Sequence, residues 1–206
     1  MEEKKINVTV DNYAGFADIS PIGTFVFTIL CFAFWAADIG LLKEGATLAI
    51  GFLGLAVFVP YLICGIALTR RGNLLGGNTY LVFGAVFGAC GGLFNTFADI
   101  LALKGIPFDY SVVGIAFLLA GLYLFSLLPG ALRTTKIDFL IFFFGALGVT
   151  GSGITVLGWL PPSSNLFNGW ALFADGVVGF YSVIATVNTA LGINLPMGKP
   201  FLAPKE

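Results

Sequence analysis

The sequence contains no histidine, and only 10% of its 206 residues are charged. A soluble domain carries about 25% charged residues, because its outer surface must face water. This chain lacks the charges for such a surface, whereas 58% of its residues are hydrophobic and its mean hydropathy is +0.97. We therefore expect the outer surface of the fold to contact lipid.

The groups that enzymes use for catalysis are also scarce. Without histidine, no imidazole can relay protons or bind haem. The sequence has no metal-ligand spacing, no glycine loop that would hold phosphates and no nucleophile paired with a base. Cys31, Cys64 and Cys90 all stand in apolar stretches and are interpreted as apolar filler. The sequence predicts a protein that is not an enzyme and that uses neither a metal nor a cofactor.

Long stretches without Asp, Glu, Lys or Arg are suited to crossing a membrane, for which a helix needs about 20 apolar residues. The uncharged interval 139–174 is too long for one span, and Pro161-Pro162-Ser163-Ser164-Asn165 marks a loop that divides it. The prediction is an all-α membrane protein with an N-terminal tail (1–20), a six-helix transmembrane domain (21–193) and a C-terminal tail (194–206). The predicted helices are Pro21–Ile39, Ala46–Thr69, Asn78–Leu101, Ser111–Leu132, Phe139–Leu160 and Asn168–Leu191.

Basic residues are divided unevenly between the two sides of this predicted domain. One side carries only Lys43 and Lys104. The side with both termini carries the other eight: Lys4, Lys5, Arg70, Arg71, Arg133, Lys136, Lys199 and Lys205. Because basic residues concentrate in cytoplasmic loops, both termini are predicted to be cytoplasmic. A net charge of −1 without a basic run argues against a nucleic-acid partner.

Acidic residues near the spans are candidate functional groups. Asp38, Asp99 and Asp138 stand near predicted helix ends, where a solvated carboxylate is the simpler interpretation. Asp99 follows Asn95 by four residues, so the two share a helix face and form a candidate polar mouth. Asp175 stands inside the sixth helix, where an ionised carboxylate is costly. It is either a proton acceptor in coupled transport, or a carboxylate that reaches the interface or is hydrogen-bonded by a neighbouring helix.

Glycine and phenylalanine are abundant in the predicted helices. Gly84, Gly88 and Gly92 follow one another at four-residue spacing, which favours close helix packing and would otherwise widen a pore. A few of the 22 phenylalanines facing inward would form a constriction that blocks hydrated ions but passes a small neutral or partly dehydrated solute. A short similarity between segments 70–85 and 133–146 equates Phe83 with Phe144. Parallel repeats of this kind are common in transporters.

Three motifs extend over nearly the whole chain. The first is Asp18-Ile19-Ser20-Pro21-Ile22-Gly23-Thr24-x-x-Phe27. The second joins Gly72-Asn73-Leu74-Leu75-Gly76 to Tyr80-x-x-Phe83-Gly84-x-x-Phe87. The third comprises Gly169-Trp170, Tyr181, Asn188 and Leu195-Pro196-Met197-Gly198. Together they resemble the acetate uptake transporter family, the acetate/succinate–proton symporters of microbes, whose first motif reads Asn-Pro-Ala-Pro-Leu-Gly-Leu-x-x-Phe.

The resemblance implies proton-coupled transport of small monocarboxylates such as acetate, with succinate or lactate as further substrates, across the plasma membrane. It also implies a pathway through each protomer of a homohexameric ring. Phe27 and Phe83 would form a constriction on odd-numbered helices, to which the internal similarity adds Phe144. The residues assigned to the substrate pathway are Thr24, Asn73, Tyr80, Gly84, Phe87, Tyr181 and Asn188.

The physics of charge transfer favours proton coupling independently of the resemblance. Carrying a lone carboxylate against a negative interior costs ~2.3 kcal/mol per 100 mV, and moving a proton with it removes that cost. Desolvating the neutral acid is also far cheaper than desolvating the anion. Two alternatives stay open. One is a passive channel for a small neutral solute such as urea or an amide, and the other is a non-transporting membrane sensor, which the short loops disfavour.

Overall fold

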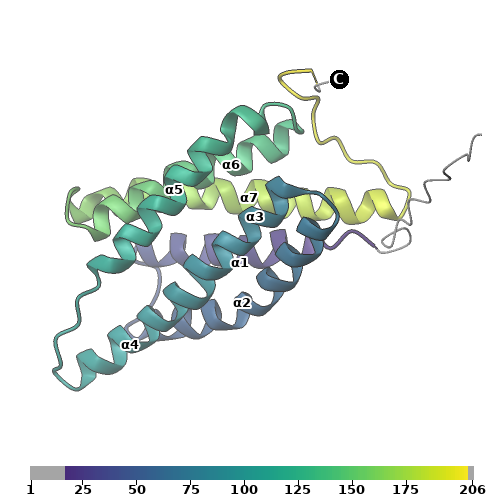
Figure 1. Ribbon diagram of the computed structural model, residues 1–206. Helices are drawn as coiled ribbons and strands as arrows, with labels where there is room; N and C mark the ends of the chain where they lie inside the picture. Colours follow the sequence, from purple (N-terminus) through teal and green to yellow (C-terminus); the bar gives the residue numbers. More distant parts are fainter. Residues whose placement is uncertain (1–16, 204–206) are drawn as a thin grey trace, which may run out of the picture.

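The computed structural model describes residues 17–203, and these form a bundle of long helices (Figure 1). A π-helical segment, η1 (Gly84–Cys90), joins α3 and α4 into one span, and a 3₁₀ turn, η2 (Pro162–Ser164), precedes α7. The helices are α1 (Ser20–Asp38), α2 (Ala46–Arg70), α3 (Leu74–Phe83), α4 (Gly91–Leu103), α5 (Ser111–Ala131), α6 (Lys136–Val156) and α7 (Asn165–Ala190). The described residues thus contain six helical spans long and apolar enough to cross a membrane. The predicted all-α fold of six spans is confirmed.

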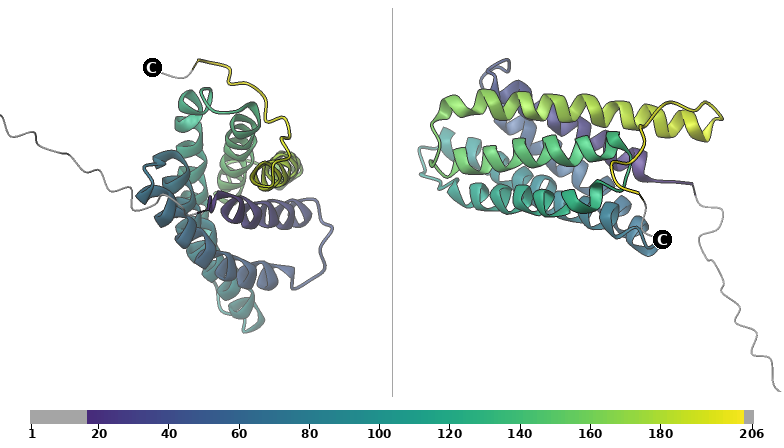
Figure 2. Two further views of the ribbon diagram at one scale, coloured as in Figure 1. Left: turned by 90° about the vertical axis from the view of Figure 1, so that its right-hand side faces the viewer. Right: turned by 90° about the horizontal axis from the view of Figure 1, so that it is seen from above.

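The six spans form a ring around a central axis (Figure 2). Each span contacts the next one along the chain, and α7 returns to contact α1. Successive spans run in opposite directions, so α1, α3 and α6 begin at the end of the ring where α2, α5 and α7 finish. We call this the proximal end and the opposite one the distal end.

The described basic residues keep the predicted imbalance. Lys43 and Lys104 lie at the distal end. Those at the proximal end are Arg70, Arg71, Arg133, Lys136 and Lys199. Residues 1–16, with Lys4 and Lys5, and residues 204–206, with Lys205, lie outside the described part of the chain.

The third span begins at Leu74, four residues before the predicted start at Asn78. The side chain of Asn73 caps this helix by accepting a hydrogen bond from the Gly76 N–H at 2.9 Å. The span after α5 likewise begins at Lys136, three residues before its predicted start, because a threonine caps it. Counting apolar residues misses such starts, since the count carries no information on the capping side chain that fixes where the helix begins.

The predicted glycine groove of the third span packs against α2. A Cβ atom added at Gly88 would lie 2.9 Å from the Phe58 Cα atom, and one at Gly92 would lie 2.7 Å from the Leu55 backbone nitrogen. Two backbones this close leave no room for a side chain between them. Small residues allow such an approach in membrane helices, so close packing is the use of this spacing.

The π-helical segment η1 was not predicted from the sequence. Such segments interrupt α-helices and are frequent at functional sites. Because a π turn holds more residues than an α turn, side chains four positions apart lie closer to one face. Phe83 and Phe87 accordingly meet edge to face, with ring centroids 5.1 Å apart. The segment aligns two aromatic side chains along one wall of the ring.

Candidate functional site

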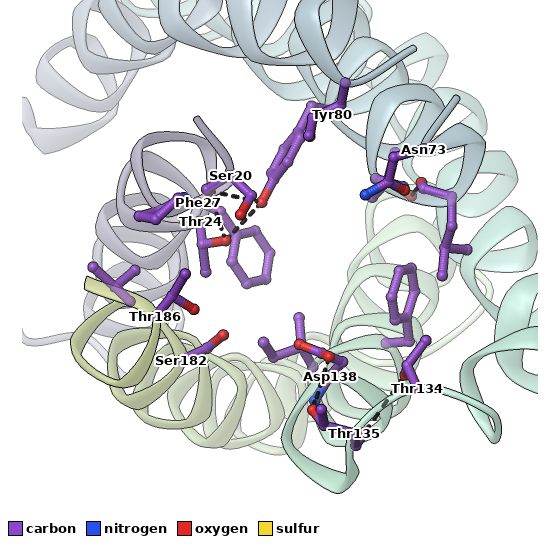
Figure 3. A pocket seen from close by; sticks show the side chains of 18 of the residues that line it. Ser20, Thr24, Phe27, Asn73, Tyr80, Thr134, Thr135, Asp138, Ser182 and Thr186 are labelled. Carbon is purple, nitrogen blue, oxygen red and sulfur yellow. Dashed lines mark hydrogen bonds between the residues drawn. The ribbon is translucent and has the colours of Figure 1, made fainter. Parts of the chain in front are cut away.

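A cavity of about 430 Å³ lies at the proximal end of the ring (Figure 3). Residues from all six spans line it, which places it on the central axis. Side-chain hydroxyl and amide groups are frequent in its wall: Ser20, Thr24, Asn73, Thr79, Tyr80, Thr134, Thr135, Ser182 and Thr186. This cavity, the proximal cavity, therefore offers hydrogen-bonding groups to a small polar solute.

A second cavity of about 320 Å³, the distal cavity, is also lined by residues of all six spans. Of the predicted polar mouth, Asn95 lines this cavity, and its side-chain oxygen accepts a hydrogen bond from the Tyr110 hydroxyl. Asp99 instead accepts a hydrogen bond from the Leu48 N–H at 2.8 Å. It thereby caps the first turn of α2.

Phenylalanine rings separate the two cavities: Phe27, Phe34, Phe83, Phe87 and Phe117. We call these rings the aromatic barrier. Phe27 and Phe83 line the proximal cavity and stack with centroids 5.8 Å apart. Phe87 and Phe117 line the distal cavity and stack at 4.9 Å. The edge-to-face contact between Phe83 and Phe87 joins the two pairs, so an apolar layer closes the axis between two more polar spaces.

The structure brings Phe27 and Phe83 together as the predicted constriction requires, but it does not bring Phe144 to them. Phe144 packs beside Phe143, with ring centroids 5.5 Å apart, and lines neither cavity. The ring that α6 turns into the proximal cavity belongs to Phe142.

Helix register explains this difference. Phe83 follows the capping residue Asn73 by ten residues, and Gly145 follows the capping residue Thr135 by ten. Both line the proximal cavity, and so do the pairs at matching positions, Thr79 with Ile141 and Tyr80 with Phe142. The internal similarity therefore pairs Phe83 with Gly145 rather than with Phe144. A slip of one residue turns a side chain by about 100° around its helix.

The remaining predicted pathway residues divide into two groups. Thr24, Asn73 and Tyr80 line the proximal cavity, and Phe87 lines the distal one. The other group, which borders neither cavity, consists of Gly84, Tyr181 and Asn188.

Each residue of the second group is engaged elsewhere. Gly84 faces α2, where an added Cβ atom would lie 3.1 Å from that of Tyr61. The Tyr181 hydroxyl donates a hydrogen bond to the Pro196 carbonyl at 2.9 Å. The Asn188 amide donates one within its own helix at 2.8 Å. The first two contacts hold helices and tail together, the third lies within α7, and none of the three residues borders a cavity.

Tyr80 ties α3 to the first turn of α1 (Figure 3). Its hydroxyl lies 2.6 Å from Thr24 Oγ1 and donates to the Ser20 carbonyl at 3.2 Å. Its ring stacks on Tyr61 with centroids 6.0 Å apart. The tyrosine thus fixes the spacing of two walls of the proximal cavity.

This tie can be measured by a double-mutant cycle. Tyr80→Phe and Thr24→Val each remove one side of the hydroxyl contact, so the double variant should lose less stability than the two single losses together. We expect a coupling energy of about 1 kcal/mol, the typical contribution of one hydrogen bond. Thermal unfolding of the purified protein in detergent gives the values. Tyr80→Phe combined with Thr186→Val should be additive, and additive losses for Tyr80 with Thr24 would contradict the contact.

The chain was compared with family models, curated proteins and solved structures. No protein-family model matches the chain, and no curated protein matches it in sequence. Among solved structures, that of the bacterial acetate channel SatP matches with a TM-score of 0.74. The chain has the fold of SatP. The two are 18% identical, and the match covers 89% of this chain and 99% of SatP. At this identity the likeness concerns the fold, which is the fold that the sequence resemblance implied.

Within this SatP-like ring, sequence reasoning missed two members of the aromatic barrier. Phe34 and Phe117 pack edge to face with centroids 6.3 Å apart. Phe117 lies on α5, the fourth span, whereas the predicted wall used only odd-numbered helices. No local signal distinguishes these rings from the other phenylalanines of the chain. Their inward direction follows from the way α1 and α5 face each other across the axis.

The proximal cavity of the SatP-like ring is surrounded by helix starts. The N-terminal ends of α1, α3 and α6 meet there, and helix N-termini carry partial positive charge. Two carboxyl groups also line it. Asp18 accepts hydrogen bonds from the N–H and hydroxyl of Ser20 at 3.0 and 2.7 Å, and Asp138 accepts one from the Thr135 hydroxyl at 2.7 Å. The cavity therefore combines positive helix ends with negative side chains.

The segment after α7 returns across the proximal end (Figures 1 and 2). Met197 lines the proximal cavity, and its carbonyl accepts a hydrogen bond from the Ile137 N–H at 3.2 Å. Further along, the Leu202 N–H donates to the Leu132 carbonyl at 2.9 Å. The part of the predicted C-terminal tail that the structure describes is therefore bound to α5 and α6 and belongs to the cavity wall.

Asp175 lies in the middle of α7 with 0% of its surface exposed. Its Oδ2 atom lies 3.9 Å from the Cys31 sulfur, and its Oδ1 atom has no hydrogen-bond partner among the described residues. The carboxyl group does not reach the interface. Its one donor on a neighbouring helix is a thiol, which is a weak donor. The fold therefore leaves a buried acid with little to stabilise a charge.

Proposed function

We propose that the protein transports small monocarboxylates, with acetate as the reference substrate, across a membrane along the axis of its own helical ring. The observation that carries this proposal is the placement of the two cavities, each lined by all six spans and separated by the aromatic barrier. A solute on this axis is bordered by residues of all six spans. The fold shared with an acetate channel supports the same substrate class.

We also propose that the substrate crosses the barrier together with a proton. The positive helix ends around the proximal cavity attract an anion, whereas Asp18 and Asp138 repel it. The barrier consists of phenyl rings, which offer no replacement for the water around a carboxylate. A proton that moves close beside the carboxylate lowers this desolvation cost and removes the ~2.3 kcal/mol per 100 mV that a lone charge meets.

The excess of basic residues at the proximal end supports its placement in the cytoplasm, with the protein in the plasma membrane. The homohexameric assembly implied by the family resemblance stays a prediction. Native mass spectrometry of the purified protein measures that assembly directly. Succinate and lactate, the further substrates implied, enter the transport assay as competitors.

Counterflow of labelled acetate into proteoliposomes tests the proposed function. Vesicles loaded with unlabelled acetate should take up label faster than protein-free liposomes, which measure the passage of acetic acid through the lipid. Unlabelled lactate outside should compete with the label, and urea should not. Acetate uptake no faster than in protein-free liposomes, together with a urea or amide flux that ignores a pH jump, would identify a passive neutral-solute channel instead.

A further inference from the structure

We propose that Asp175 binds the coupling proton and that Gly145 is the gap in α6 through which this carboxyl group borders the proximal cavity. The inference rests on the proposed function, transport of a monocarboxylate with a proton. It names the residue that binds the proton and the position at which that residue borders the proximal cavity.

Gly145 stands where the pathway wall lacks a side chain. It lines the proximal cavity at the position that Phe83 occupies on α3. A Cβ atom added at Gly145 would lie 2.8 Å from Asp175 Oδ2 and 3.3 Å from Leu124 Cδ1. Where α3 presents a phenyl ring, α6 therefore presents bare backbone, and the carboxyl group of α7 lies directly behind it. The acid lies beside the pathway at the level of the aromatic barrier.

The surroundings of Asp175 contain no positive charge. Every Lys and Arg of the described residues lies at a helix end, in a connection or in the segment after α7. The titratable groups that face the acid are the Cys31 thiol on α1 and the Tyr61 hydroxyl on α2. The Tyr61 hydroxyl is buried and, among the described residues, also lacks a hydrogen-bond partner. On α6 the acid borders Gly145, whose added Cβ atom would also touch Leu124 of α5, and neither of these residues can titrate.

A proton fits this space better than a metal ion. Calcium, a hard cation that carboxylates bind, takes six or more oxygen ligands. Among the described residues, no three His, Cys, Asp or Glu side chains gather in one place. A proton needs only one carboxylate oxygen. With the proton on Asp175 while the substrate anion occupies the pathway, proton and anion together add no net charge to the membrane interior.

Membrane potential provides the decisive test, because one proton moving with one acetate makes transport electroneutral. Proteoliposomes at equal pH on both sides are given a 100 mV potential with valinomycin and a potassium gradient. Wild-type net uptake of labelled acetate should not respond. Asp175→Asn keeps the shape but cannot hold the proton, so it should retain acetate counterflow and become potential-dependent. If one uncompensated charge moves with each acetate, the 100 mV potential shifts the equilibrium ratio of internal to external acetate by at most about 50-fold.

Two further variants sharpen the comparison. Gly145→Ala places a methyl group against Asp175 Oδ2, so it should slow proton-coupled uptake more than counterflow. Asp109→Asn is the matched control, because Asp109 is exposed, lines neither cavity and is replaced by a residue that can also accept the hydrogen bond from the Ser111 N–H. It should remain electroneutral.

The outcomes separate this inference from the proposed function. Absence of counterflow in the wild type overturns the proposed function, and electrogenic wild-type uptake overturns proton coupling. Electroneutral uptake in both wild type and Asp175→Asn overturns the Asp175 assignment alone. Accumulation driven by a sodium gradient in place of protons overturns proton coupling and the Asp175 assignment with it. Should Asp175→Asn not fold, infrared difference spectra of wild-type protein with ¹³C-labelled aspartate decide. An acetate-induced change in a buried carboxyl band supports the assignment, and its absence overturns it.

Discussion

Phe83→Ala should open the aromatic barrier, raising acetate uptake and admitting larger carboxylates and chloride that the wild type excludes. Phe83 is 4% exposed and contacts the rings of Phe27, Tyr61 and Phe87, so its removal joins the two cavities. If the ring contributes about 1.4 kcal/mol to the barrier for a polar solute, its loss raises the flux about tenfold. Counterflow with labelled acetate and succinate, and a chloride-sensitive dye inside the vesicles, measure both effects.

Phe97→Ala is the control for this prediction. Phe97 lies on the same span but is 50% exposed on the outside of the ring. Its removal should leave uptake and selectivity unchanged. Removing the Phe83 ring should also destabilise the protein, by about 3 kcal/mol for a buried phenylalanine. Unchanged uptake and continued exclusion of chloride in folded Phe83→Ala protein would show that the barrier lies elsewhere.

Gly92→Val should prevent the third span from packing on α2 and so abolish the folded ring. The first carbon atom of the new side chain would already lie 2.7 Å from the Leu55 backbone nitrogen and 3.1 Å from the Gly51 carbonyl oxygen. Backbone atoms on a neighbouring helix cannot rotate away, so the two helices must separate. We expect a loss of about 3 kcal/mol, at the upper end for overpacking. Size-exclusion chromatography and thermal unfolding in detergent measure the loss.

The matched control is the same substitution at Gly130, a helical position of α5 with no neighbouring atom within 4 Å of the added Cβ. Gly130→Val should keep the elution profile and melting temperature of the wild type. Equal melting temperatures for Gly92→Val and Gly130→Val would mean that the close contact between α2 and α4 does not support the fold.

Several features of the site followed from sequence because they depend on local patterns. The glycine groove that includes Gly88 and Gly92 predicted a packed helix face, since residues at four-residue spacing lie on one side of a helix. The motif residues Thr24 and Tyr80 were predicted for the pathway, and both line the proximal cavity. Asp175 was singled out because a carboxyl group inside a membrane span is costly wherever it points. None of these expectations required the rotation of a helix to be known.

The rotation of each helix had to come from the tertiary structure. The prediction chose Phe144 on α6, whereas the structure turns Phe142 and Gly145 toward the axis. It also omitted Phe117, which closes the distal cavity from α5. In a soluble protein the apolar face of a helix marks its inner side, but both lipid and core are apolar here. Hydropathy therefore cannot say which phenylalanine faces inward.

The sequence by itself determined the number of spans and their approximate ends, because a membrane requires about 20 apolar residues for each crossing and water requires the charges to stay outside it. Only the tertiary structure decided which side chains meet on the axis. Contacts at Gly92 and at the caps Asn73 and Thr135 fix the height and rotation of the helices. A shift of one residue in that register turns a side chain by about 100° around its helix, away from the pathway. The same register places Gly145 in front of Asp175.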